Sequence, residues 1–277
     1  MANPQFDEIG YWSEVKLEIL ASYGRAYSTI LAAQKHPPLS HIYIDAFAGS
    51  GTHISRSTGD LVPGSPANAL NIKPPFDEYH LIDTNPQKIA HLEEMVRDQP
   101  GVHIYQGDCN KILLDEVFPR VRYDEYKRGL CILDPYGLDL SWDVIRTAGQ
   151  MKSLDIFLNF PVLDMNRNVL WHDSEKVDPA QTARLNYFWG DNSWKDAAYE
   201  TANNLFGFPE KQTNDVIADA FRRRLKDIAG FIRVPPPLPM RNSKGGIVYY
   251  LYFASQKNTA EHIVLQIFEK FKNRGEK

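Results

Sequence analysis

His41-Ile42-Tyr43-Ile44-Asp45-Ala46-Phe47-Ala48-Gly49-Ser50-Gly51 is the stretch that decides the fold of this chain. An apolar run of this kind, rich in β-branched and aromatic residues, suits a buried parallel strand, which we expect at residues 41–46. The Gly49-Ser50-Gly51 turn that follows lets a ligand approach the backbone closely. The stretch therefore predicts a buried strand, a small-residue turn open to a ligand, and then a helix.

Asp45 changes the kind of ligand that this turn suits. Gly-rich turns that bind phosphate offer backbone N–H groups and a helix dipole to an anion, and a carboxylate at the mouth would repel it. The spacing also lacks the Lys of the phosphate loop and the third Gly of the dinucleotide fingerprint, since no Lys follows Gly51 and Ile54 stands at the third Gly position. S-adenosylmethionine, which carries an ammonium and a sulfonium group, fits better than a pyrophosphate. A purely structural turn is the alternative at this point.

Composition describes an ordinary globular protein of 277 residues, with 43% hydrophobic and 24% charged residues. The net charge of −4 differs from the strongly basic charge typical of nucleic-acid-binding domains. The chain has no run of 18 apolar residues and no basic-then-apolar leader, so we expect a cytoplasmic protein without membrane contact. Cys109 and Cys131 are expected to be reduced core residues, and the eight scattered His predict no metal site. Arg222-Arg223-Arg224 is interpreted as a solvated helix face.

Further strand-like runs follow at residues 79–82, 102–105, 130–133 and 154–161. The first three end at Asp83, in the polar turn of Asp108, and at Asp134. Helical patterns alternate with the strands, which implies right-handed crossovers and a parallel sheet whose ligand crevice lies at the carboxyl ends of the strands. Four carboxylates in the same strand-end position favour a ligand site over a bare structural sheet.

The flanking segments complete the expected organisation. Residues 7–34 read as one amphipathic helix with Lys16 at its surface, and Ser65 reads as the cap of a short helix. Residues 231–234 look strand-like, the prolines at 235–239 form a stiff link, and a strand at 247–254 precedes a helix at 259–272. The predicted segments are an N-terminal helix covering the sheet (1–40), an α/β core that binds S-adenosylmethionine (41–161), a helical, aromatic-rich insertion (162–230), and final strands and a helix that complete the core (231–277).

Each strand end has an expected role in binding the donor or the acceptor. Asp83 would bind the ribose hydroxyls, as an acidic residue at the end of the second strand does in related sheets. In Asp134-Pro135-Tyr136, the carboxylate and the Pro carbonyl would accept from a planar amino group while the Tyr ring stacks on the attached base. The remaining residues would hold the methionine part (Asp45, Phe47, Ala48, Gly49, Ser50, Gly51) and the adenine edge (Asp108, Cys109, Asn110).

The ordered set of motifs resembles one family, the three-Cys-motif partner proteins called TcmP. The motifs are Trp12 with Lys16-Leu17 and Tyr23, the strand and turn at 43–51, Gly64-Ser65-Pro66, Gly107-Asp108-Cys109-Asn110, Leu133-Asp134-Pro135-Tyr136-Gly137 and Asn166-Arg167-Asn168. The resemblance covers residues 10–190 and, more loosely, the rest of the chain. It implies a Rossmann-like class I methyltransferase fold, an α/β sheet that is mostly parallel and doubly wound, in a bacterial protein. It also implies a partner encoded nearby, a protein with a three-cysteine motif of the radical-S-adenosylmethionine type.

The Asp134-Pro135-Tyr136-Gly137 stretch is also similar to the fourth motif of the tRNA guanine N2-dimethyltransferases. More distantly it resembles the Asp-Pro-Pro-Tyr of amino-methylating DNA and rRNA enzymes, from which it departs by lacking the second Pro. These resemblances imply methyl transfer to an amino group of a nucleobase or nucleic acid. Two alternatives stay open: a non-catalytic methyltransferase-like partner that docks through residues 162–230, and a magnesium-dependent nuclease.

Overall fold

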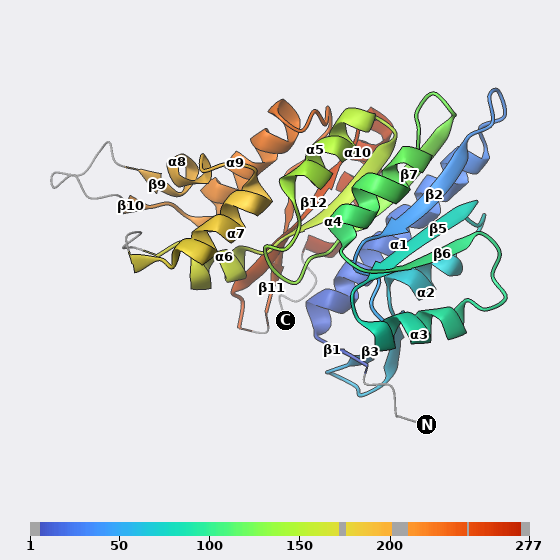
Figure 1. Ribbon diagram of the computed structural model, residues 1–277, viewed down its shortest axis with the longest axis horizontal. Coiled ribbons are helices and arrows are strands. Elements are labelled where there is room, and N and C mark those ends of the chain that lie inside the picture. The colour runs from blue at the N-terminus through green and yellow to red at the C-terminus, as the bar shows by residue number, and fades with distance from the viewer. Residues whose placement is uncertain (1–5, 172–175, 201–209, 243, 273–277) are drawn as a thin grey trace.

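A seven-stranded sheet forms the centre of the protein in the computed structural model, which describes residues 6–171, 176–200, 210–242 and 244–272 (Figure 1). The strands lie in the order β11-β12-β8-β7-β2-β5-β6. Their bounds are β2 Ser40–Asp45, β5 Glu78–Asp83, β6 Val102–Gln106, β7 Lys127–Leu133, β8 Leu154–Phe160, β11 Leu238–Arg241 and β12 Ile247–Ala254. All five strands expected between residues 41 and 161 are therefore present.

The chain winds outward from the middle of this sheet in two directions. From β2 it runs through β5 to β6 on one side, and it returns to β7 and β8 on the other, with all five strands parallel. The β12 strand then pairs antiparallel with β8, and β11 pairs antiparallel with β12. This is the mostly parallel, doubly wound α/β sheet that the sequence predicted, and its strand order reverses between β2 and β7, where ligands of such sheets bind.

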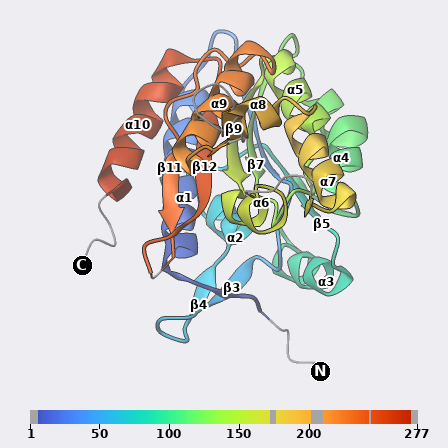
Figure 2. The same ribbon diagram turned by 90° about the vertical axis from the view of Figure 1, so that its left-hand side faces the viewer.

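Helices cover both faces of the sheet (Figures 1 and 2). One apolar core lies between the sheet and α1 (Tyr11–Ala32), α2 (Ser65–Leu70), α3 (Pro86–Met95) and α10 (Asn258–Lys272). The other face is covered by α4 (Cys109–Ile112), the short turns η1 (Leu113–Val117) and η2 (Phe118–Arg120), and α5 (Trp142–Met151). Both cysteines are free and buried, as expected. None of the helices in the described ranges combines the length and apolar character needed to cross a membrane.

The apolar core beneath α4 and α5 is called the second core, and the region between β8 and β11 extends it. This region contains α6 (Val162–Asn168), α7 (Pro179–Trp189), α8 (Trp194–Ala198), a β9–β10 pair (Tyr199–Glu200 and Glu210–Lys211) and α9 (Asn214–Asp227), gathered at one end of the molecule in Figure 1. Phe160, Phe188 and Phe221 join in one aromatic cluster, with ring centroids 4.7 to 5.9 Å apart. The predicted segment boundaries, which also include residues outside the described ranges, stay a prediction.

The basic stretch at 222–224 is not a solvated face. Arg222 and Arg223 pair with Asp219, whereas Arg224 is buried. The Arg224 guanidinium donates to the Trp189 carbonyl at 2.6 Å and to Asp191 at 2.7 Å. The amphipathic period of α9 turns this third arginine inward, so the prediction was wrong for one of the three residues.

Local expectations failed near the N-terminus. The first helix begins at Tyr11, because Glu8–Ile9 forms a strand, β1. This strand pairs with β3 (Thr52–Ser55), which also pairs with β4 (Leu61–Pro63), so the chain enters a small sheet directly after the glycine turn, and the helix expected there was wrong. The cap of α2 is Gly64, and Ser65 is the first helical residue.

The proline-rich segment also differs from expectation. Residues 231–234 form no strand apart from one bridge between Arg233 and Ser255, and Pro239 lies within β11. The strand tolerates proline because β11 is the edge of the sheet, where a residue without an N–H breaks no ladder on its outer side. The prediction of a stiff proline link at 235–239 was therefore wrong at its end, where Pro239 belongs to a strand.

Candidate functional site

The four strand-end carboxylates lie along one edge of the sheet. Asp45 ends β2, Asp83 ends β5, Asp134 directly follows β7, and Asp108 comes two residues after β6. These strands are parallel neighbours in the order β7-β2-β5-β6, so their carboxyl ends share an edge, which we call the carboxyl rim. The expected gathering of these four residues at one rim is confirmed.

The glycine turn after β2 is fastened to the end of β5. Gly49 and Gly51 have φ values of 65° and 77°, in the left-handed region that favours glycine. The Gly49 N–H donates to Asp83 Oδ2 at 2.9 Å, and the Ala48 N–H donates to the Ile82 carbonyl at 2.9 Å. Phe47 is half-buried beside the second core, and Ser50 is buried with its hydroxyl donating to the Thr52 carbonyl. The turn thus stands in a defined shape at the point where the strand order reverses.

Asp45 is fully buried beneath this turn. Its carboxylate accepts from the Tyr43 hydroxyl at 3.1 Å and the Phe47 N–H at 3.3 Å, and the Ser65 hydroxyl also donates to it. Burial raises the pKa of Asp45 to about 6, against the effect of these donors. In this arrangement Asp45 shapes the turn from below. Direct contact with the methionine part of a donor stays a prediction that requires the carboxylate to become uncovered.

Asp83 stands half-buried at the mouth of the turn. Besides Gly49, it accepts from the Asn85 N–H, at 2.8 Å through Oδ1. Each carboxylate oxygen therefore keeps one lone pair, and two adjacent ribose hydroxyls could donate to them. Asn85 in turn caps α3 by accepting from the N–H groups of Gln87 and Lys88. The ribose role stays a prediction with a suitable geometry.

The turn after β6 is braced against the turn after β7. Asp108 Oδ1 accepts from both the N–H and the side-chain amide of Asn110, at 3.0 and 2.9 Å. Asn110 also donates to the Asp139 carbonyl and accepts from the Ser141 N–H. Asp108 is exposed with Oδ2 open to a donor, whereas Asn110 is buried and its amide serves the brace. Burial raises the pKa of Cys109 to about 12, so this thiol stays protonated inside the second core.

Asp134 is paired with Lys16, which the sequence placed at the surface. The Lys16 ammonium contacts Asp134 Oδ2 directly, and the two side chains are only 11% and 29% exposed. Burial opposes the charge on Lys16, but the Asp134 carboxylate outweighs it and raises the lysine pKa. Lys16 Nζ also lies 5.3 Å from the centre of the Tyr249 ring. The expectation of a surface lysine was wrong because α1 packs on a face of the sheet and Lys16 lies among its buried residues.

Pro135 and Tyr136 face different surroundings. The Pro135 carbonyl accepts from the Asn159 side chain at 3.1 Å, at the end of β8. Tyr136 is 79% exposed, and its hydroxyl donates to Asp7 at 3.2 Å. Lys88 lies 5.6 Å from the centre of the Tyr136 ring and pairs with Asp7 at 2.6 Å. After Asp134, the chain therefore presents the Pro135 carbonyl, which a hydrogen bond holds in place, and then the Tyr136 ring, which is exposed to solvent.

Three residues that the sequence did not single out belong to this site: Asn159, Tyr249 and Lys88. Asn159 Oδ1 and the Tyr249 hydroxyl are buried and have no hydrogen-bond partner among the described residues. Buried polar atoms are paired in the large majority of cases, so two orphans at one place point to a missing ligand. Their strands, β8 and β12, pair antiparallel, which brings the start of β12 to the end of β8. The signal in the sequence was an Asn near the end of a strand whose other polar residue, Asp155, stands near its start.

A cavity of about 330 Å³ lies away from this site, lined by residues of α1 and α10 and by Asp155, near the amino end of β8. Tyr23 and Ser255 donate to the Asp155 carboxylate, and burial raises its pKa to about 6. This cavity is at the opposite end of the strands from the carboxyl rim.

Comparison with known proteins shows the fold. No protein-family model and no curated protein sequence matches this chain. Among solved structures, protein LPL1258 from Legionella pneumophila is similar over 94% of this chain and 93% of its own, with 13% identity and a TM-score of 0.52. TYW2 from M. jannaschii, crystallised with AdoMet, matches at 10% identity and a TM-score of 0.36, over 88% of this chain and 75% of its own.

The O-methyltransferase NcsB1 of neocarzinostatin biosynthesis, crystallised with S-adenosylmethionine, matches at 12% identity and a TM-score of 0.37, over 89% of this chain and 61% of its own. At TM-scores below 0.5, the likenesses to TYW2 and NcsB1 say nothing further about this chain. The likeness to LPL1258 extends over nearly the whole of both chains and concerns the fold alone.

Proposed function

We propose that this protein is an S-adenosylmethionine-dependent methyltransferase that acts on an amino group of a nucleobase or nucleic acid. The observation that carries the proposal is the pair of orphaned polar atoms, Asn159 Oδ1 and the Tyr249 hydroxyl, next to Asp134 and the Pro135 carbonyl. Asp134 Oδ1, the Pro135 carbonyl and Asn159 Oδ1 are all acceptors, and a planar amino group offers two donors.

The residues at the carboxyl rim suit the donor. The backbone of the glycine turn lies where the strand order of the sheet reverses, at the usual ligand site of such sheets. Asp83 keeps two lone pairs free to accept from the ribose hydroxyls. Asp108 Oδ2 could accept from the amino group of an adenine ring. When bound, S-adenosylmethionine supplies a methyl group that its sulfonium already activates.

The chain's own contribution to the transfer is position and proton acceptance. Asp134 Oδ1 would accept one N–H of the acceptor and hold its nitrogen lone pair toward the methyl group, and the Pro135 carbonyl would accept the other. Transfer would break the sulfonium S–C bond and leave a neutral thioether, and the Asp134 carboxylate would take the proton that the acceptor nitrogen gives up. The Lys16 ammonium contacts Oδ2 and so orients this carboxylate. The exposed Tyr136 ring would stack on the base, an interaction worth ~1–3 kcal/mol.

One observation favours the alternative, a non-catalytic partner of a three-cysteine-motif protein encoded nearby. The ion pair with Lys16 occupies one oxygen of the carboxylate that is expected to hold the acceptor. In a protein that transfers nothing, this pair would serve only to close α1 over the sheet. Resemblance to the TcmP family supports the partner, and co-purification of the two proteins without methyl transfer would favour this alternative.

The first test is calorimetric titration of the purified chain with S-adenosylmethionine. We expect saturable binding that Asp83→Ala weakens at least tenfold, whereas Glu94→Gln, an exposed change on α3, leaves it unaltered. The folded state of each variant is checked by circular dichroism. A folded wild-type chain that binds no donor would contradict the proposal.

The second test separates donor from acceptor. Asp134→Ala and Asn159→Ala should retain donor binding and lose transfer of labelled methyl groups to nucleosides or RNA. Loss of donor binding in Asp134→Ala would refute this division of roles. Measurement of magnesium-dependent cleavage of the same RNA tests the nuclease alternative.

A further inference from the structure

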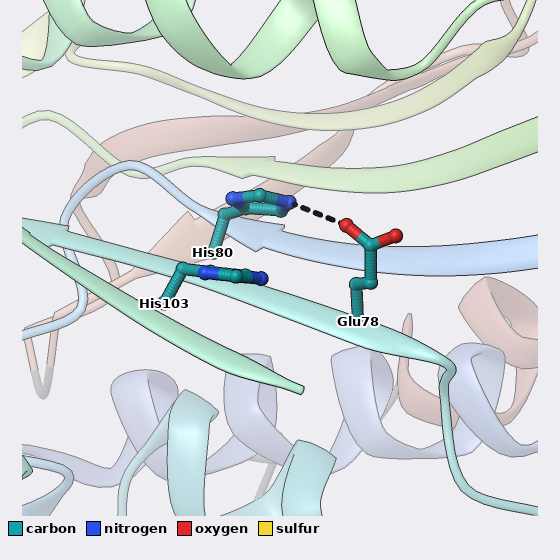
Figure 3. Close-up of side chains that lie close together, drawn as sticks. All are labelled: Glu78, His80 and His103. Carbon is teal, nitrogen blue, oxygen red and sulfur yellow. Dashed lines mark ion pairs between the residues drawn. The ribbon is translucent and has the colours of Figure 1, made fainter. Parts of the chain in front are cut away.

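Three potential metal ligands meet at the pairing of β5 with β6, away from the carboxyl rim. His80 and His103 are direct partners in the parallel register of these strands. Neighbouring strands lie ~4.8 Å apart, which accounts for the stacked imidazole rings with centroids 4.9 Å apart and an interplanar angle of 16°. Glu78 precedes His80 by two residues, so its side chain leaves the same face of the sheet. Figure 3 shows the Glu78 carboxylate at the edge of the two rings.

One ligand atom of this cluster is buried without a partner. The His80 side chain has no exposed surface, and its Nε2 makes no hydrogen bond among the described residues. Nε2 lies 3.4 Å from Glu78 Oε2, and the dashed line in Figure 3 marks this ion pair. A buried polar atom without a partner destabilises the fold, so a group that bonds to Nε2 would offset that cost.

The surroundings of the His80 ring suit a metal ligand. Its Nε2 faces the Glu78 carboxylate at 3.4 Å, and imidazole nitrogen and carboxylate oxygen are both zinc ligands. Its other nitrogen, Nδ1, lies 3.0 Å from the Tyr105 hydroxyl. Metal-binding histidines almost always donate the second ring N–H to such a group, which holds the ring in place.

The distances favour a small tetrahedral ion. Zinc bonds of ~2.0–2.1 Å to nitrogen and oxygen place neighbouring ligand atoms ~3.4 Å apart. Nε2 of His80 and Oε2 of Glu78 are already 3.4 Å apart, and all three ligand atoms lie within 4.8 Å of one another. His103 and Glu78 are half-buried, so a modest side-chain rotation can close the remaining gap. Two imidazoles and one carboxylate favour zinc, cobalt or nickel over magnesium or calcium.

We propose that Glu78, His80 and His103 bind a zinc ion, or a divalent transition metal of similar preference, that ties β5 to the edge strand β6. His80 precedes Asp83 by three residues, ~10 Å along β5, so the ion lies away from the donor site. Its role is structural, and the proposal stands independently of methyl transfer. The sequence pattern did not show it because His103 comes 23 residues after His80, and only the β5–β6 register unites them.

The test uses the full chain after treatment with a chelator and dialysis. Zinc chloride is titrated by calorimetry at pH 7.5, and cobalt chloride is followed by visible absorption. We expect one ion per chain and the intense bands of four-coordinate cobalt. His103→Gln and Glu78→Gln should each weaken binding at least tenfold. His262→Gln, which removes an exposed histidine on α10, should leave it unchanged.

Two further measurements keep the outcome clear. Circular dichroism establishes that each variant is folded, and Glu78→Gln carries the test alone where His103→Gln is unstable. Zinc should slow amide hydrogen exchange in β5 and β6 of the wild-type chain, and less so in Glu78→Gln. The proposal is overturned where the wild-type chain binds no zinc, where the ligand variants bind as tightly as His262→Gln, or where zinc leaves exchange in β6 unaltered.

Discussion

The Lys16–Asp134 pair allows a quantitative test of how α1 is joined to the carboxyl rim. The perturbations are Lys16→Met, which keeps the aliphatic stem and removes the charge, Asp134→Asn, which keeps the shape of the carboxylate, and the double variant. Each single change leaves one charge without its partner. The loss in unfolding free energy depends on how far water can rehydrate the charge that remains.

The two single changes should differ in size. Lys16 is 11% exposed, so Asp134→Asn leaves a nearly buried ammonium and should destabilise the fold by about 3–5 kcal/mol. Asp134 is 29% exposed and can be partly rehydrated, so Lys16→Met should cost only about 1–2 kcal/mol. The double variant buries no lone charge, so its cost should be well below the sum. We expect a coupling free energy of about 2–3 kcal/mol.

Urea unfolding at pH 7.5, followed by circular dichroism, measures all four free energies. The matched control is a second cycle on Arg122 and Asp124, whose side chains are 55% and 68% exposed. That pair should show no measurable coupling, because both charges are fully hydrated. Coupling below about 0.5 kcal/mol for Lys16 and Asp134, or equal costs for the two single variants, would refute the argument from burial.

Other substitutions test the two cores. Burial raises the pKa of Asp155 to about 6. Between about pH 4 and pH 6, the Asp155 carboxyl therefore binds its proton more tightly in the folded chain than in the unfolded chain. The stability that this group contributes falls as the pH rises through this range. Relative to Asp155→Asn, the wild-type chain should lose about 2 kcal/mol between pH 4.5 and 7.5 in urea unfolding, and a constant difference would contradict this. Arg224→Met should lower the unfolding free energy by about 3 kcal/mol, because this guanidinium is buried and hydrogen-bonded. The control, Arg223→Met at an exposed position, should change it by less than about 0.5 kcal/mol. Similar melting temperatures for the two variants would count against a buried, stabilising role of Arg224. Gly149→Ala should lower the unfolding free energy by about 1–3 kcal/mol, since the added Cβ would lie 2.1 Å from the Ala229 carbonyl oxygen. An unaltered melting temperature would show that the backbone at Ala229 moves aside without cost.

The strands and their polar ends were predictable from the sequence because both depend on local pattern. A run such as residues 42–44 is apolar, which a strand buried on both faces requires, and the Asp residues at 45, 83, 108 and 134 mark the carboxyl end of each strand. Short elements escaped prediction. The β1 strand has two residues, and it exists because β3 offers it a partner, which no local pattern records.

Residue roles were less predictable than element positions. Asp45 and Asp134 occupy equivalent strand-end positions, yet one is fully buried beneath a turn and the other is paired with a lysine from α1. Strand-end position says which edge a side chain belongs to. Its burial and its partners depend on segments that arrive from distant parts of the chain.

The sequence by itself determined the alternation of strands and helices, the parallel sheet and the row of carboxylates at one edge, since each follows from hydrophobic period and turn chemistry within a few residues. Only the tertiary structure decided which groups meet: Lys16 with Asp134 across 118 residues, Asn159 with Pro135, and His80 with His103. Such contacts depend on strand order, register and helix orientation. These are set by burial of the whole apolar surface at once, so no single stretch of sequence contains them.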